Sequence, residues 1–205
     1  MGVRSGATGW PLVHDEPAGL RARYVGQSPE KVRHLPASSR TRIRPDVTVR
    51  AHVLRAATPA DLRATRELLA GSIGQSPYAA LAGCADDAVP GGDECRALVA
   101  DAGRDIIGVV VFGQVAGTIG AGKLHLVAVS TEARLKGAAT ELVRAALADL
   151  AARGARLVVA ELADDPIFRP VRALLRRCGF VEEARIDDYY RDGVALIVLR
   201  HQIAR

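Results

Sequence analysis

The sequence lacks any apolar run long enough to cross a membrane and has few cysteines. No stretch approaches the roughly 18 to 20 consecutive apolar residues that a membrane helix requires. The first 30 residues contain no continuous apolar segment of the kind found in a secretory signal. The three cysteines, Cys84, Cys95 and Cys178, are odd in number and widely spaced. This spacing gives neither a disulfide framework nor a metal-binding pattern, so we expect reduced thiols, no metal and a cytoplasmic protein with no membrane partner.

Aromatic residues are also scarce, at 4% of the chain, whereas hydrophobic residues of all kinds make up 49%. The 205 residues are therefore enough for one domain with a largely aliphatic core and an extension. The formal net charge is +5, but residues 1–48 hold eight basic and four acidic residues, so most of the excess charge lies there. The rest of the chain is close to neutral.

Residues 1–46 are predicted to be a disordered basic arm. They show neither strand nor helix periodicity, and they carry Gly, Pro, Ser and Arg throughout. A nucleic-acid-binding arm is the functional alternative. Its basic residues are dilute, and its two aromatic residues, Trp10 and Tyr24, do not interleave with them. The composition therefore disfavours nucleic acid as a partner.

From Val47 onwards the apolar pattern changes repeatedly between the strand period and the helix period. Strands are predicted at residues 47–54, 95–101, 106–116, 123–130, 155–162, 180–190 and 195–203. Helices are predicted at residues 61–73, at 78–81, from the segment 132–143 to Gly154, and at 164–178. The resulting order is β-α-α-β-β-β-α-β-α-β-β. Three consecutive strands followed by two β-α-β crossovers predict one α/β domain over residues 47–205, with a mixed, mostly antiparallel sheet of about seven strands and helices on both faces.

The segment RLKGAAT, residues 134–140, lies between a strand rich in Val and Leu and a long helical pattern. Phosphate binding at a helix start requires converging backbone N–H groups, the positive end of the helix dipole and small side chains. The small residues here are Gly137, Ala138, Ala139 and Thr140, and the basic ones are Arg134 and Lys136. On these residues alone, an ordinary loop before an alanine-rich helix explains the pattern equally well.

The wider pattern resembles the GCN5-related N-acetyltransferase (GNAT) family. The family signature V-x-V-x-x-x-x-R-x-x-G-x-G/A is matched by Val127, Val129, Arg134, Gly137 and Ala139. The segment CGFVEEARIDDYYRDG, residues 178–193, is similar to the helix end, sixth strand and closing hairpin of small-molecule members. The resemblance covers about residues 47–205, which it identifies as an acyl-CoA N-acyltransferase domain.

The resemblance implies an acetyl-CoA site. The pyrophosphate would be held by the backbone amides of Leu135, Lys136, Gly137, Ala138, Ala139 and Thr140, beside Arg134. The pantetheine arm would pair with the backbone of Val127, Ala128 and Val129, at a splay between the fourth and fifth strands. We therefore predict direct transfer of an acyl group, acetyl above all, from acyl-CoA to the primary amine of a small molecule. A catalytically silent acyl-CoA-binding module is the alternative, and the family's frequent dimers allow a homodimer.

Transfer from a thioester to an amine needs a group that accepts the amine proton and a group that protonates the leaving thiolate. Glu161, at the end of the strand 155–162, is the first candidate base, with a solvated strand-end carboxylate as the alternative reading. His125 is a second candidate, although a lone histidine within a strand more often packs. Ser130, a loop residue after the strand, is a weaker candidate for a hydrogen-bond donor.

The proton donor is absent from the place where many members carry a tyrosine, in a pattern like F-Y-E-R-x-G-F. Leu175 occupies that position and has no proton to donate. Tyr189 and Tyr190, near the closing hairpin, are candidate substitutes, with structural packing as the alternative. Asp187 and Asp188 are either a source of negative charge for the acceptor or solvated turn residues. Cys178 is expected to pack at its helix end rather than to act as a nucleophile.

Overall fold

The computed structural model of the chain describes residues 52–204 except for residues 75, 79–83, 89–94 and 135–136. The predicted arm, residues 1–46, and the start of the predicted first strand lie outside the described residues. The division into an arm and a domain at residue 47 therefore stays a prediction.

Within the described residues, seven strands and four helices follow one another in the predicted order. The strands are β1 (Val53–Ala56), β2 (Arg96–Asp101), β3 (Ile106–Gln114), β4 (Ala121–Val129), β5 (Leu157–Ala163), β6 (Val181–Arg191) and β7 (Val194–Gln202). The helices are α1 (Leu62–Ile73), α2 (Cys84–Asp87), α3 (Ala138–Ala152) and α4 (Arg169–Arg177). Short 3-10 turns at Pro59–Asp61, Thr131–Ala133 and Pro166–Phe168 precede α1, α3 and α4.

Two helices differ from their predicted positions. The third begins at Ala138 instead of near residue 132, because a 3-10 turn and the extended backbone of Arg134 come first. The short second helix was predicted at residues 78–81, and residues 79–81 lie outside the described part of the chain. The structure has α2 a few residues later, at Cys84–Asp87.

The sheet has the strand order β1-β2-β3-β4-β5-β7-β6. Every neighbouring pair is antiparallel except β4 and β5, which run parallel. The chain leaves β5, passes through α4 to the outer strand β6, and returns between them as β7. The predicted mixed, mostly antiparallel sheet of seven strands is thus confirmed.

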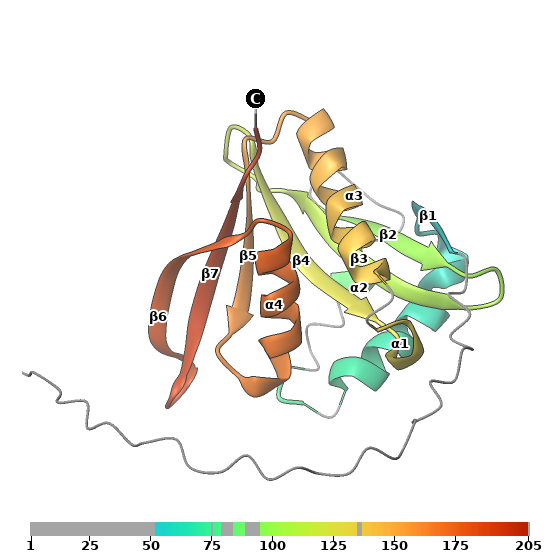
Figure 1. Cartoon of the computed structure of the whole chain (residues 1–205), viewed down its shortest axis with the longest axis horizontal. Helices are drawn as coiled ribbons and strands as arrows, with labels where there is room; N and C mark the ends of the chain where they lie inside the picture. Colours follow the sequence, from blue (N-terminus) through green and yellow to red (C-terminus); the bar gives the residue numbers. More distant parts are fainter. Residues whose placement is uncertain (1–51, 75, 79–83, 89–94, 135–136, 205) are drawn as a thin grey trace, which may run out of the picture. The chain divides into compact units, whose positions relative to one another are not determined.

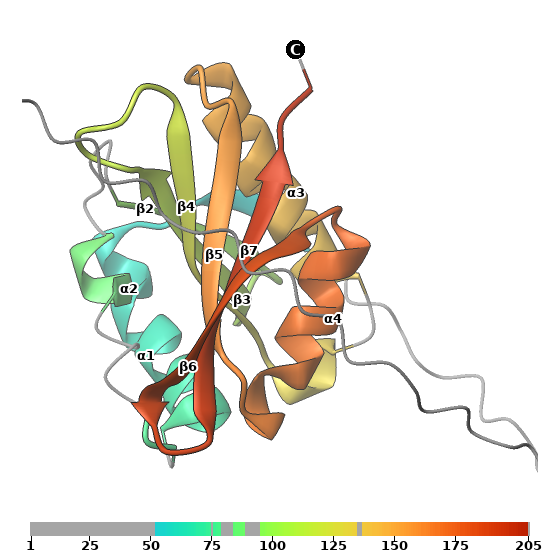
Figure 2. The same ribbon diagram turned by 90° about the vertical axis from the view of Figure 1, so that its left-hand side faces the viewer.

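Helices cover both faces of this sheet, as predicted. Figure 2 shows α1 and α2 on one side of the strands and α3 and α4 on the other. In β3, Val110 and Phe112 pack into the core beneath α3 and α4, whereas Val109 and Val111 pack into the core beneath α1 and α2. Successive side chains of a strand point to opposite faces, so a strand covered on both faces is apolar throughout.

Helix α3 is fixed on the sheet by a stripe of fully buried side chains. These are Leu142, Val143, Ala146 and Leu150, each with 0% exposure. Full burial of a Leu or Val side chain stabilises the fold by about 1.5 to 3 kcal/mol. Gly108 and Gly122 permit the close approach, because a Cβ atom added there would come within 2.8 and 2.9 Å of Leu142 and Leu150. The packing holds the start of α3 beside the end of β4.

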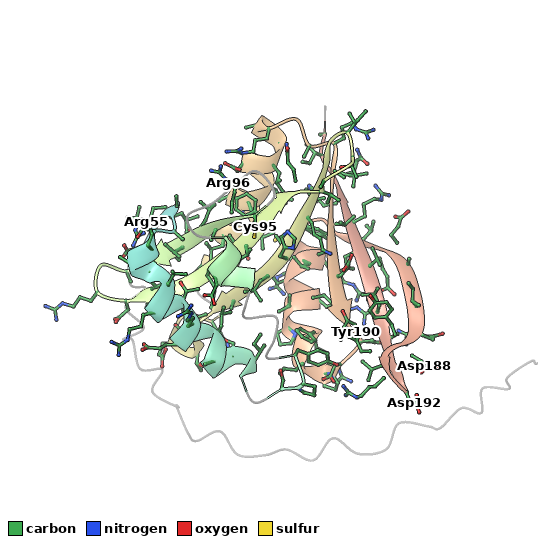
Figure 3. The ribbon with its side chains drawn as sticks, turned by 180° about the vertical axis from the view of Figure 1, so that it is seen from behind. Arg55, Cys95, Arg96, Asp188, Tyr190 and Asp192 are labelled. Carbon is green, nitrogen blue, oxygen red and sulfur yellow. The ribbon has the colours of Figure 1, made fainter. Side chains whose placement is uncertain are left out.

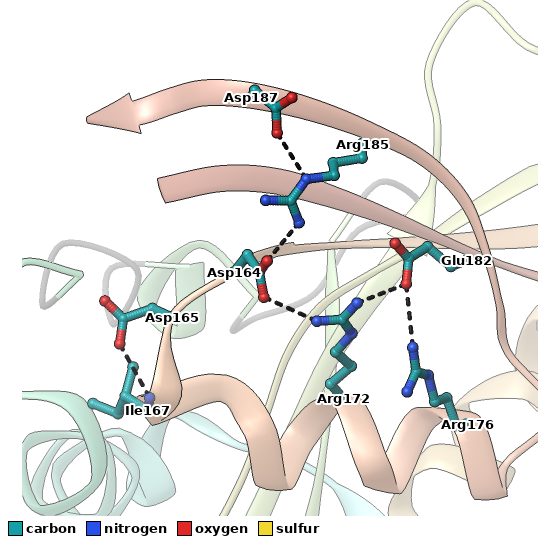
Figure 4. A network of polar contacts seen from close by, with 8 residues as sticks. All are labelled: Asp164, Asp165, Ile167, Arg172, Arg176, Glu182, Arg185 and Asp187. Carbon is teal, nitrogen blue, oxygen red and sulfur yellow. Dashed lines mark hydrogen bonds and ion pairs between the residues drawn. The ribbon is translucent and has the colours of Figure 1, made fainter. Parts of the chain in front are cut away.

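A network of ion pairs joins α4 to the outer strand β6 (Figure 4). Arg172 pairs with Asp164 at 2.9 Å and with Glu182 at 2.7 Å. Arg185 also pairs with Asp164, and its guanidinium holds the pKa of that carboxyl below the ordinary value. The network links the end of β5, the middle of α4 and the first half of β6.

Among the described helices, none has both the length and the apolar character that crossing a membrane requires.

Candidate active site

The parallel strands β4 and β5 are paired over only part of their length. Residues Ala121–Leu124 pair with Leu157–Ala160, and the pairing ends there although both strands continue. Figure 1 shows the two ribbons diverging from this point. A bulge in β4 contributes to this divergence. Phe112 pairs with Leu124 and Val111 pairs with Leu126, which leaves His125 as an extra residue in β4. Bulges bend the strand that contains them.

A cavity of about 760 Å³ lies where the two strands part. Its lining includes residues from both sides of the sheet. Ala139 of α3 and Leu175 of α4 contribute from one side, and Leu69 and Ile73 of α1 contribute from the other. The cavity therefore passes through the sheet, and two molecules are able to approach one point from opposite faces.

The start of α3 forms one end of the cavity. Gly137 has φ +93°, a left-handed conformation that side chains other than glycine rarely adopt. The N–H groups of Thr140 and Glu141 donate to the carbonyl of Gly137, at 2.8 and 3.1 Å. The first N–H groups of a helix, here those of Ala138 and Ala139, have no acceptor within the helix and carry its positive dipole end. This geometry suits an anion.

Most of the predicted phosphate-binding residues lie around this helix start. Arg134, Gly137, Ala139 and Thr140 line the cavity, and Ala138 is buried next to them. Leu135 and Lys136 lie outside the described residues. Arg177, at the end of α4, also lines the cavity. It was missed from the sequence, since nothing in the helical pattern of α4 distinguishes it from neighbouring arginines.

The end of β4 offers a strand edge to the cavity. Val127, Ala128 and Val129, which are predicted to pair with the pantetheine arm, all line it. They pair with β3 on one side. On the other side, the described pairing with β5 has already ended at Leu124. An edge of this kind presents alternate N–H and C=O groups to a ligand.

Glu161 lies in β5 just beyond the last residue paired with β4, and it lines the cavity. Its Oε2 atom is 2.9 Å from Nζ of Lys123, and the two side chains are 42% and 30% exposed. Ala160 packs into the core beneath α3 and α4, so the alternation of the strand directs Glu161 towards the α1 face. Ion pairs with this degree of exposure contribute at most about 1 kcal/mol to stability, so the carboxylate of Glu161 can separate from Lys123 at little cost.

Tyr190 lines the same cavity, and Tyr189 does not. Burial raises the pKa of Tyr190 above the ordinary value, and the nearby Glu161, Tyr189 and Tyr78 add to the effect. Its hydroxyl therefore stays protonated at neutral pH. Tyr189 is 59% exposed and packs edge-on against Tyr190, with ring centroids 5.1 Å apart. Of the two tyrosines, Tyr190 is the one that lines the cavity together with Glu161.

Asp187 and Asp188 have partners within the β6–β7 hairpin. Asp188 has φ +54°, and its Oδ1 atom accepts a hydrogen bond of 2.7 Å from the N–H of Gly193. Asp187 pairs with Arg185 at 2.7 Å. Figure 3 shows Asp188 near the tip of the hairpin and Tyr190 farther from it. The carboxylate of Asp188 closes the turn, which agrees with its reading as a turn residue.

Comparisons with known proteins agree with this geometry. The sequence profile of the Acetyltransferase (GNAT) family matches residues 70–180. This chain belongs to the GNAT acetyltransferase family. No curated protein sequence matches the chain.

Solved GNAT structures superpose on most of this chain. A GNAT-family protein from Desulfovibrio desulfuricans is 25% identical with a TM-score of 0.68, and the alignment covers 75% of this chain and 100% of that one. A ribosomal-protein-alanine N-acetyltransferase from Brucella melitensis is 18% identical with a TM-score of 0.60, covering 74% and 99%. The NatC complex bound to Gag peptide and CoA includes a chain that is 15% identical with a TM-score of 0.59, covering 75% and 99%.

Of the other residues considered in this GNAT chain, Cys178 and Ser130 have structural contacts, whereas Leu175 and His125 line the cavity. Leu175 is fully buried and lines the cavity. Because its side chain is a hydrocarbon, no hydroxyl is present at that position. Cys178 is buried, and burial raises the pKa of its thiol, as expected of a packed cysteine. Ser130 donates its N–H to the carbonyl of Ile107 and begins the 3-10 turn before α3. His125 lines the cavity at the bulge.

Sequence reasoning missed two contributors to the GNAT site besides Arg177. Lys123 was read only as part of a strand, although it pairs with Glu161 across the parallel strands. Tyr78 was read only as the first residue of a short predicted helix, and it lines the cavity from the segment after α1. Neither residue has a local signature, because each acts through a partner distant in the sequence. Among the described residues there is no cluster of three His, Cys, Asp or Glu side chains placed to hold a metal ion.

Proposed function

We propose that this GNAT chain transfers an acetyl group from acetyl-CoA to the primary amine of a small molecule. The observation that carries the proposal is a single cavity through the sheet. One end contains the start of α3 and the free edge of β4, and the other contains Glu161 and Tyr190. A donor and an acceptor entering from opposite faces would therefore meet where the strands part.

The residues at the α3 end fit coenzyme A. Gly137, Ala138 and Ala139 place no large side chain over the first amides of the helix, and Arg134 and Arg177 supply positive charge. The edge of β4 at Val127–Val129 offers backbone groups to an amide-containing arm. When bound, acetyl-CoA supplies an acetyl group activated as a thioester. The GNAT structure solved with CoA supports this assignment by fold.

The residues at the α1 end fit the two proton transfers. Glu161 takes the proton of the acceptor amine, directly or through water, and Lys123 holds its carboxylate in place until then. Tyr190, whose raised pKa keeps it protonated, donates its hydroxyl proton to the leaving sulfur. Transfer is direct in this proposal, as the family resemblance implies, and burial raises the pKa of the Cys178 thiol, which disfavours it as a covalent nucleophile.

The small-molecule acceptor rests on the likeness of residues 178–193 to small-molecule members of the family. One solved neighbour is named as a ribosomal-protein-alanine N-acetyltransferase, and another is the NatC complex bound to a Gag peptide. Their identity to this chain is below 20%, so they support the fold and not the acceptor. The composition supports action in the cytoplasm.

A catalytically silent acyl-CoA-binding module is the second candidate, and Leu175 favours it. An apolar side chain lines the cavity where many members carry the tyrosine that protonates the thiolate. A thiolate is nevertheless a fair leaving group, because thiols ionise with a pKa near 8.5. The two candidates share the coenzyme site and differ only in turnover.

Titration calorimetry of acetyl-CoA into the full-length chain, followed by thiol release across a panel of primary amines, separates the candidates. Binding with thiol release supports the transferase. Binding without release on every amine supports the silent module. If acetyl-CoA does not bind, the start of α3 is an ordinary helix start and both candidates are wrong.

A further inference from the structure

Three aromatic side chains from three separate segments contact one another and form one wall of the cavity. Tyr78 follows α1, Phe168 precedes α4, and Tyr190 lies near the end of β6, and all three line the cavity. Tyr78 contacts Phe168 edge to face, with ring centroids 4.9 Å apart and an interplanar angle of 67°. It contacts Tyr190 in the same manner at 5.7 Å and 87°. A chain with only 4% aromatic residues thus concentrates rings on this wall.

The hydroxyls of Tyr78 and Ser72 are engaged within the protein, whereas the hydroxyl of Tyr190 is the group proposed to protonate the leaving sulfur. The hydroxyl of Tyr78 donates to Asp165 at 3.3 Å and accepts a hydrogen bond of 3.1 Å from Arg191. The hydroxyl of Ser72 donates to the carbonyl of Leu68 at 3.0 Å. Apart from the hydroxyl of Tyr190, the residues of this wall offer a ligand ring surface and aliphatic surface. A ligand with several hydroxyl or amide groups would lose hydrogen bonds to water on entering and regain few.

The charges near this wall are balanced. Glu161 is the one carboxylate among the described residues that line the cavity, and it is paired with Lys123. Asp165, beside the wall, is paired with Arg191 at 2.9 Å. A first ammonium group is accommodated at Glu161, where it becomes neutral when its proton is removed. A second positive charge would find no carboxylate without a partner, and burying an unpaired charge is costly.

We infer that the acceptor is a primary amine joined through a short apolar linker to an aromatic group, with no second charge. This inference rests on the proposed function, because it assigns this end of the cavity to the acceptor. Tyr190, which is 40% exposed, offers a further ring an edge-to-face contact of the kind that it already makes with the buried Tyr78, and Tyr78 holds the Tyr190 ring in place. The amine then lies towards Glu161, and the ring lies towards α1 and Phe168.

Calorimetry on the full-length chain saturated with CoA tests this inference without requiring turnover. The probes are 2-phenylethylamine, n-butylamine and 1,4-diaminobutane, which compare an aryl amine, an alkyl amine and a diamine. We expect 2-phenylethylamine to bind about tenfold more tightly than n-butylamine, since an aromatic contact of this kind contributes on that order. We expect 1,4-diaminobutane to bind no more tightly than n-butylamine. Equal affinities, or a preference for the diamine, would overturn the inference.

Two variants at one position locate the preference. Tyr78→Leu removes the ring and keeps apolar volume, and the aryl-to-alkyl affinity ratio should fall from about tenfold to about twofold. Tyr78→Phe keeps the ring and removes the hydroxyl, and the ratio should be retained. CoA affinity, measured on each variant first, reports that the protein is folded. A ratio that survives in Tyr78→Leu shows that the ring wall does not select the ligand.

Thiol release from acetyl-CoA with the same amines separates the failure of this inference from the failure of the proposed transfer. Aryl-selective binding without thiol release would overturn the transfer and leave the ligand class standing. Thiol release at equal kcat/KM from the aryl and alkyl amines, with equal binding, would overturn the ligand class and leave the transfer standing.

Discussion

The two ends of the cavity are built from different parts of the polypeptide. The end at α3 is formed by the backbone of one continuous segment around Gly137 and by the edge of β4. The end at α1 is formed by side chains from four separate segments, among them Tyr78, Lys123, Glu161 and Tyr190. A backbone site demands small residues at consecutive positions, whereas a side-chain site demands only that the fold bring its members together.

This difference predicts different responses to substitution. The α3 end should be sensitive to backbone conformation and tolerant of many side-chain changes outside the turn. The α1 end should be sensitive to the loss of individual functional groups, even when the backbone is undisturbed. Each of the following experiments tests one side of this contrast.

The largest effect is expected at Glu161. Glu161→Gln keeps the shape of the side chain and removes the proton acceptor, so kcat should fall on the order of 100-fold, the lower range for loss of a general base. The affinity for acetyl-CoA should change less than about twofold. Glu183→Gln is the matched control, because Glu183 pairs with Arg200 at 2.8 Å and does not line the cavity. An unaltered kcat in Glu161→Gln would remove this residue as the base.

A somewhat smaller effect is expected at the backbone end. Gly137→Val forces a β-branched residue into φ +93°, at a strain of about 1 to 3 kcal/mol that the turn relieves by moving the amides. Acetyl-CoA affinity should fall about 30-fold, within the range of that strain. Gly103→Val imposes the same strain at φ +87° in the β2–β3 turn, where a Cβ meets nothing within 4 Å. Calorimetry showing equal losses in both variants would indicate general destabilisation and not a coenzyme site.

Tyr190→Phe should lower kcat about tenfold, less than the base variant, because a thiolate can leave without a dedicated acid. The raised pKa of Tyr190 gives a pH dependence. The hydroxyl must be protonated to act, so its contribution persists at neutral pH and is lost only as the pH rises above the ordinary tyrosine pKa of about 10. Tyr189→Phe should leave kcat nearly unchanged, since Tyr189 does not line the cavity. A loss of kcat in Tyr189→Phe, with no loss in Tyr190→Phe, would make Tyr189 the proton donor.

The smallest effect on either end is expected from Asp61, the third residue of a capping box in which Thr58 is the N-cap of the 3-10 turn before α1. Its carboxylate accepts hydrogen bonds from the N–H and hydroxyl of Thr58, at 2.7 and 2.8 Å, and pairs with Arg55 at 2.7 Å. Asp61→Asn should lower the free energy of unfolding by about 1 to 2 kcal/mol, as the loss of a helix cap does. Affinity for acetyl-CoA and for amines should not change. Asp86→Asn, which removes an exposed pair with Arg66, should have little effect in the same urea titration.

The pH dependence of this stabilisation has a defined sign. The hydrogen bond from Arg55, followed by the bonds from Thr58, lowers the pKa of Asp61 below its ordinary value. The contribution is therefore complete above the unfolded pKa of about 3.9 and is lost as the pH falls towards the lower folded value. The difference in unfolding free energy between the wild type and Asp61→Asn should shrink below about pH 4. A constant difference from pH 6 to pH 3 would contradict the cap.

The elements that the sequence predicted well are those with a strong local pattern. Strand β3 is buried on both faces, so it reads as a continuous apolar run. Helix α3 is buried on one face, so its apolar residues recur at the helical period. The beginning of α3 was predicted too early, since nothing local distinguishes a 3-10 turn at Thr131–Ala133 from a first helical turn. The short α2 has too few residues to show a period.

The sequence by itself determined the family and the order of helices and strands along the chain, and it singled out the segment around Gly137, where the small residues are adjacent in the chain. It also singled out Glu161, because the residue ends a buried strand. Only the tertiary structure decided that Glu161 is paired with Lys123 and that Tyr190 and not Tyr189 lines the cavity. The physical reason is that a backbone turn is encoded by consecutive residues, whereas contacts between distant side chains depend on the register and divergence of strands.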